Sequence, residues 1–183
     1  MKREYIGTIL SMIGMVLNVV AFHARKKRTL LILHFIATCF HMCSYIFSGG
    51  GMGIWLNMVF LARSALFLKT ENSQRKDRLK VYYLICAGCV IAYAAFTLAA
   101  KPPLADCLWN AIPIIGAFFG TYAFVHTDMV KLRYVKMVDS VSWLLFNGHV
   151  GIGALGGFLG EVFNIISMLL AIRREKKEAA AAA

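Results

Sequence analysis

The chain has 183 residues, of which 60% are hydrophobic and 16% are charged, with a mean hydropathy of +0.67 and a formal net charge of +11. A soluble domain of this size needs more charge to cover its surface, so the composition excludes a soluble globular protein and predicts an integral membrane protein. The positive charge is then better explained by loops that meet anionic lipid headgroups than by a nucleic-acid partner.

Seven apolar runs follow one another along the chain, each near the roughly twenty residues that cross about 30 Å of hydrocarbon. We predict membrane-spanning helices at residues 5–23, 29–47, 52–69, 80–99, 105–125, 132–148 and 153–172. The sixth run is the weakest, because Arg133, Lys136 and Asp139 interrupt it. It can span only if these side chains reach the membrane surface or pair inside the protein. Short glycine turns are expected at residues 48–51 and 147–151.

The cations are sorted by loop. Sixteen of the 20 Lys and Arg residues lie beside the first, third and fifth connections and after the seventh run. Because cations stay on the cytoplasmic side during insertion, this bias predicts an outside N-terminus, a cytoplasmic C-terminus and seven crossings.

The chain contains an internal repeat. Ile13, Gly14, Ala21 and Phe22 recur as Ile115, Gly116, Ala123 and Phe124, 102 positions later. We therefore predict an all-α membrane protein with a parallel 3+1+3 arrangement of two triple-helix bundles. The first bundle covers residues 1–76, a linker helix covers 77–103 and the second bundle covers 104–178, followed by an alanine-rich tail at 179–183 that we leave out of the fold.

Polar side chains gather on repeat-equivalent faces of the predicted spans. His34, Thr38, His41 and Tyr45 share one helical face, and Ser140, Trp143 and Asn147 take up the equivalent positions in the second half. Asn57 corresponds to Glu161, which shares a face with Asn164 and Ser167. Because polar groups in a membrane tend to face a cavity, we predict a substrate site formed by His41, Tyr45, Asn57, Trp143, Asn147, Glu161 and Asn164. A single Asn, Ser or Thr in a span more often joins helices by a hydrogen bond than binds a ligand, and only the coincidence of polar faces at repeat-equivalent positions makes the two explanations equal.

Arg63 is the most costly side chain to bury in a membrane, and it needs a partner. Asp139 and Glu161 are available, and Asp139 is nearer in depth. The pair is either a fixed ion pair or a gate that forms and breaks. Pro113 and Gly116 in the fifth span predict a hinge, although glycine is also common in membrane helices that do not move.

No sequence motif indicates catalysis. The chain contains no GxSxG, HExxH or phosphate-binding loop, so we expect neither an enzyme nor a cofactor. His34 and His41 lie two turns apart, too sparse a set to predict a metal site, whereas proton exchange at His41 stays open. The five cysteines lie in predicted spans and are expected to pack as small apolar residues.

Three stretches resemble the YgjV-type bacterial inner-membrane proteins: Ile112–Gly116, Trp143–Asn147 and Gly156–Glu161, together with His41 and Trp55–Asn57. That family is similar to the SWEET, semiSWEET, PQ-loop and PnuC transporters. The resemblance implies a bacterial inner-membrane location and a site between two three-helix bundles. It also implies an aromatic residue from the second helix of a bundle, which Trp143 fits, and an amide from the third, which Asn57 fits.

The resulting hypothesis is a transporter that moves a small polar solute, such as a sugar, a vitamin or a related metabolite, by alternating access. Glu161 and His41 depart from the sugar-transporter pattern and favour a charged or basic solute, or proton coupling. The alternative is a membrane scaffold or sensor whose polar residues join helices. A wet central cavity would separate the two. Homo-oligomerisation stays open.

Overall fold

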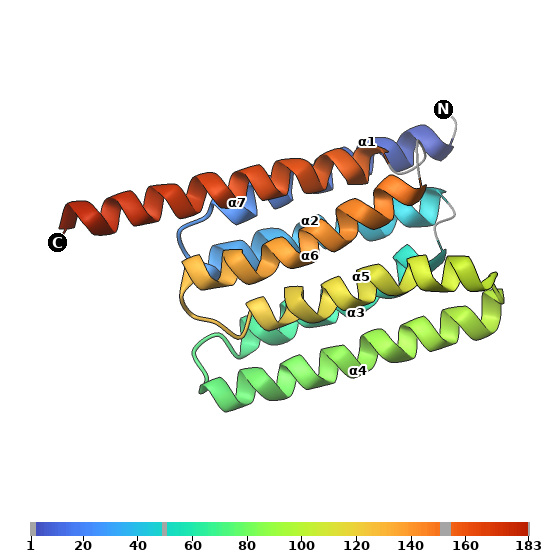
Figure 1. The fold of residues 1–183 in the computed structure, drawn as a ribbon, viewed down its shortest axis with the longest axis horizontal. Helices are drawn as coiled ribbons and strands as arrows, with labels where there is room; N and C mark the ends of the chain where they lie inside the picture. The colour runs from blue at the N-terminus through green and yellow to red at the C-terminus, as the bar shows by residue number, and fades with distance from the viewer. Residues whose placement is uncertain (1–2, 49–50, 151–154, 183) are drawn as a thin grey trace.

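A computed structural model describes residues 3–48, 51–150 and 155–182 (Figure 1). Over these residues the chain is all-helical, with seven helices. They are α1 (Arg3–His23), α2 (Lys27–Ser48), α3 (Gly51–Lys69), α4 (Arg75–Ala100), α5 (Leu104–Ala123), α6 (Met129–Val150) and α7 (Leu155–Ala182). All of them except α6 are long and apolar enough to cross a membrane.

Of the two predicted glycine turns, the structure agrees with the first and shifts the second. The expected turn at residues 147–151 begins later, because α6 continues through Asn147 to Val150. The first turn falls between Ser48 and Gly51, which end α2 and begin α3. Gly49, Gly50 and Gly151, as well as the predicted start of the last span at residue 153, lie outside the described residues.

The helices form a closed ring. Each packs against its neighbours in the chain, and α7 returns to pack against α1. The helices run back and forth, so that α1, α3, α5 and α7 all begin at the end of the molecule that holds the N-terminus (Figure 1). We call this end the N-terminal end and the opposite one, which carries most of the cations, the basic end. The faces that point away from the ring are apolar, as on α4, where Leu84, Ile91 and Leu98 are 62–76% exposed; this is the surface that lipid would cover.

The tightest packing lies at the basic end. Fully buried large side chains gather there: Phe22, Leu30, Leu31, Phe67, Phe124, Val125 and Leu132 are at most 1% exposed. They come from the ends of α1 and α3, from the residues that directly follow α5, and from the beginnings of α2 and α6. The ring is therefore closed by an apolar plug at the basic end.

Charged side chains of α6 point inward rather than toward lipid. Arg133 is fully buried and donates to the carbonyls of Phe22 (2.9 Å) and Ala24 (2.6 Å) and to Glu175 (2.7 Å). Lys136, one turn farther along, pairs with Asp139. The charged residues that lower the hydropathy of α6 are therefore paired inside the protein and do not face lipid.

Candidate solute cavity

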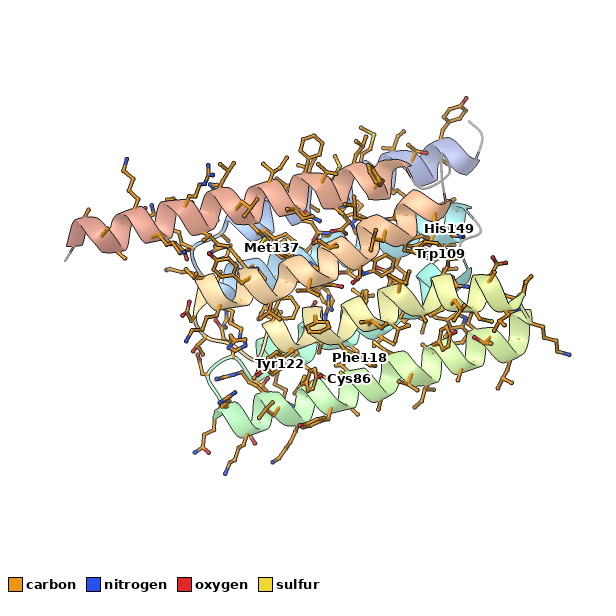
Figure 2. The ribbon with its side chains drawn as sticks, in the orientation of Figure 1. Cys86, Trp109, Phe118, Tyr122, Met137 and His149 are labelled. Atoms are coloured by element: carbon orange, nitrogen blue, oxygen red, sulfur yellow. The ribbon has the colours of Figure 1, made fainter. Side chains whose placement is uncertain are left out.

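A cavity of about 550 Å³ lies inside the ring and is lined by side chains from all seven helices. Its lining begins near the N-terminal end, at Thr8, Tyr45 and Gly156, and reaches Phe22 and Lys136 next to the plug. A volume of this size lies within the range of small-molecule sites. Figure 2 shows the side chains of the described residues on the seven helices that surround the cavity.

Four residues singled out in the sequence form one layer of the cavity wall. His41, Asn57, Trp143 and Glu161 each lie six or seven residues from the N-terminal end of the bundle, on α2, α3, α6 and α7, and all four line the cavity. We call this set the mid-cavity layer. Their common depth follows from the helix rise of 1.5 Å per residue. It places an aromatic ring, an amide, an imidazole and a carboxylate around one space.

The other three predicted site residues also line the cavity. Tyr45 and Asn147 lie one turn nearer the N-terminal end, and Asn164 lies one turn deeper, where its Nδ2 donates to Glu161 Oε2 at 3.3 Å. Tyr45 and Asn147 both sit against glycine. A Cβ on Gly53 would be 2.5 Å from the Tyr45 ring, and a Cβ on Gly157 would be 2.8 Å from Asn147. Only glycine leaves room for these two side chains.

A chain of hydrogen bonds runs along one wall. Arg63 donates through Nη2 to His34 Nε2 (2.7 Å), His34 Nδ1 faces Asn18 Oδ1 (2.9 Å), and Asn18 Nδ2 faces His41 Nε2 (3.2 Å). Because arginine only donates, His34 must accept at Nε2 and donate from Nδ1, which sets the direction of every later bond. We call these four residues the Arg63 relay; it connects the region of the plug with the mid-cavity layer.

The partner expected for Arg63 is different in the structure. Asp139 pairs with Lys136 on its own helix, and among the described residues no carboxylate lies within 4.0 Å of Arg63. Arg63 instead stacks on two aromatic faces, with its Cζ 4.2 Å from the Phe60 ring centre and 5.1 Å from that of Phe124. These rings and His34 stabilise the buried guanidinium. Depth in the membrane predicted Asp139 as the partner of Arg63. It could not show that Asp139 would pair with Lys136 instead.

Pro113 and Gly116 lie on the α5 side of the cavity. Pro113 lines the cavity, whereas Gly116 faces α6, where an added Cβ would lie 2.6 Å from Ser142 Cβ. Gly120 continues this contact against Asp139. Together they allow α5 and α6 to approach closely. The hinge remains a prediction.

Sequence reasoning did not select Asn18, Phe60 and Lys136, which also line the cavity. Asn18 is the one amide in an otherwise apolar α1 segment, a signal that could have been read. Phe60 has no polar signal, and its role follows from an edge-on contact with Trp143, 6.2 Å between ring centres. Among the described residues, no group of three His, Cys, Asp or Glu side chains is placed to hold a metal ion.

Comparison with known proteins identifies the family. The model of the bacterial inner membrane protein family Imp-YgjV matches residues 5–179, nearly the whole chain, so the protein belongs to this family and is a multi-pass inner-membrane protein. No curated protein and no solved structure matches it.

Proposed function

We propose that this Imp-YgjV protein transports a small polar solute by alternating access, without covalent chemistry or a cofactor. All seven helices span the membrane, with the N-terminus outside and the basic end in the cytoplasm. Helices α1–α3 and α5–α7 form two parallel bundles joined by α4, and the solute binds between them. The partners are then the solute, a sugar, vitamin or related metabolite, and the lipid bilayer.

The observation that carries the proposal is a cavity of about 550 Å³ that ends at an apolar plug. The polar groups of the mid-cavity layer surround it at a single depth. A site that ends at a packed seal on one side has the form of one state of an alternating-access cycle. Opening at the basic end would give another state of the cycle.

Repeated contacts support the two-bundle arrangement. Tyr45 on α2 sits against Gly53 on α3, and Asn147 on α6 sits against Gly157 on α7. Each partner in the first contact precedes its counterpart in the second by 102 or 104 positions. The same packing contact between a side chain and a glycine therefore occurs at equivalent positions in the two proposed bundles.

The seventh span of the proposal is α6. It has 22 residues, about 33 Å of helix, which is enough to cross the hydrocarbon core. Arg133, Lys136 and Asp139 are all at most 6% exposed, so its charge does not meet lipid.

A scaffold or sensor is the second candidate, and the Arg63 relay favours it, since bonded polar residues in the wall can act only to join helices. The cavity separates the two functions. A scaffold has no need of a wet space at the depth of Trp143, whereas a transporter requires one.

Uptake into proteoliposomes tests the proposal. The purified chain is reconstituted and incubated with a defined mixture of sugars, nucleosides, amino acids and quaternary amines, and the trapped solutes are quantified by mass spectrometry. We expect at least one solute to enter above protein-free liposomes, and entry to be lost in Trp143→Ala. Trp55→Ala is the matched control, because Trp55 is 47% exposed on the outer face of α3. Uptake of no solute, or equal uptake by Trp143→Ala, would count against transport through this site.

A further inference from the structure

We infer that the solute is an organic cation, held at the mid-cavity layer by Glu161 and the surrounding aromatic rings. This inference rests on the proposed transport function and names the chemical class that the same site would take.

The charges along the cavity are separated by depth. Among the described lining residues from the mid-cavity layer to the N-terminal end, Glu161 is the only acidic or basic side chain apart from histidine. His41, in the same layer, has Nε2 facing the amide nitrogen of Asn18 and so accepts there as a neutral ring. Apart from the histidines, the only charge that this half of the cavity can carry at its described lining is therefore the negative charge of Glu161.

The cations of the cavity lie deeper and already have partners. Lys136 is paired with Asp139, and Arg63 is bound to His34 and stacked on Phe60. Their backbones lie six or seven residues along their helices from the mid-cavity layer, about 10 Å of helix rise. The Lys136 ammonium reaches toward that layer as far as Asp139, which neutralises it. No cation among the described residues lies within 4.0 Å of Glu161, whose hydrogen-bond partners are the amide of Asn164 and the hydroxyl of Ser140.

Distance decides which charge dominates at the site. Coulomb energy falls as the inverse of distance, so a cation about 4 Å from Glu161 gains roughly 2.5 times what it loses to Arg63 about 10 Å away in the same medium. The Lys136–Asp139 pair adds little, because its charges cancel. An anionic solute would meet the opposite balance at this depth.

The uncharged wall of the site also suits an organic cation. Tyr45, Trp143 and Phe146 line the cavity near Glu161, and Trp143 makes edge-on contacts with Phe146 and Phe60. Aromatic faces attract quaternary and delocalised cations, with tryptophan the strongest. Asn57 and Asn147 supply amides for hydroxyl or amide groups of the same solute.

Thermal stabilisation of the purified protein tests the charge preference with paired probes. Choline is compared with 3,3-dimethyl-1-butanol, its uncharged counterpart, and 1-methylpyridinium with pyridine at pH 8, each at 10 mM. Glucose and succinate serve as a neutral polar solute and an anion. We expect a cation to raise the melting temperature while its neutral counterpart, glucose and succinate do not, since a ligand stabilises the state that it binds.

Matched variants locate the effect. Glu161→Gln should weaken binding of the stabilising cation by roughly tenfold or more, whereas Glu161→Asp should keep most of the affinity. Glu178→Gln is the control, because it removes the same charge from an exposed ion pair with Arg25 at the basic end. The melting temperature of each variant without ligand shows whether it is folded.

The outcomes are distinct from those of the uptake assay. The inference would be overturned if neither cation stabilised the protein, whatever glucose or succinate did. It would also be overturned if the response to a cation persisted in Glu161→Gln. If proteoliposomes still take up an uncharged solute in a Trp143-dependent way, only the charge assignment fails. If no solute enters at all, the transport proposal fails as well.

Discussion

Phe22 and Phe124 stand 102 positions apart in the sequence, and each has its backbone carbonyl bound by a cation from the opposite set of three helices. Arg133 of α6 donates to the Phe22 carbonyl at 2.9 Å, and Lys27 of α2 donates to the Phe124 carbonyl at 2.5 Å. The two phenylalanine rings meet on His34, with ring centres 6.0 Å and 5.7 Å from the imidazole. Reciprocal bonds of this kind hold α1–α3 and α5–α7 together beside the plug, and their release would be needed to open the basic end.

Arg133→Gln should destabilise the protein by about 3 kcal/mol, because it leaves two buried carbonyls and Glu175 without their donor. Unfolding of the detergent-solubilised protein, followed by circular dichroism, measures this loss. Arg173→Gln is the matched control: Arg173 lies at the same end of the molecule but is exposed, so its removal should change stability by less than about 0.5 kcal/mol. Equal effects of the two variants would show that the Phe22 contact contributes little.

The Arg63 relay predicts strong coupling between two buried residues. His34→Leu removes the acceptor of Arg63 Nη2 and should cost about 3–5 kcal/mol, since it leaves a buried guanidinium without its main acceptor. Adding Arg63→Met removes that charge, so the double variant should be more stable than His34→Leu alone. A double-mutant cycle on unfolding free energies measures the coupling. Additive losses would mean that the two side chains do not depend on each other.

Two glycines with different surroundings, Gly116 in the contact between α5 and α6 and Gly88 on α4, predict opposite results on substitution. Gly116→Ala should lower the melting temperature, because the new Cβ would lie 2.6 Å from Ser142 Cβ, which cannot move without its backbone. Gly88→Ala should be neutral or stabilising: its Cβ would meet only Val59 at 3.5 Å, and alanine favours a helix over glycine by up to about 1 kcal/mol. Thermal melts of both variants distinguish steric contact from helix propensity. A loss in both would point to a general intolerance of change in the bundle.

Periodicity predicted the helices and the cavity-facing residues well for physical reasons. A membrane span must be long and apolar, and a polar side chain within it must point inward, so His41, Tyr45 and Trp143 could be assigned to one interior from spacing alone. All seven residues proposed for the site line the same cavity. Their role in binding a solute stays a prediction.

Pairings across helices could not be read in the same way. Whether Arg63 pairs with a carboxylate depends on the rotation of the helices and on competing partners. In the structure Asp139 pairs with Lys136, and Arg63 donates to His34. The end of α6 was also misplaced, because Gly148 is compatible with a helix as well as with a turn. The sequence showed Arg133 as an interruption of a span. Its bonds to the carbonyls of Phe22 and Ala24, at and just beyond the end of α1, join residues 111 and 109 positions apart and could not be predicted from spacing.

Water access to the cavity can be tested on one helix. Ser11 of α1 lines the cavity, whereas Ile9, two residues earlier, is 50% exposed on the outer face of the same helix. In a background with the five native cysteines replaced, Ser11→Cys should react with a charged, membrane-impermeant thiosulfonate added to whole cells. Ile9→Cys should not react, because a thiolate does not form in hydrocarbon. Reaction at position 11 from outside the cell would support both a wet cavity and an outside N-terminal end. Reaction only in inverted vesicles would reverse the proposed orientation, and silence at both positions from both sides would favour a dry interior and the scaffold function.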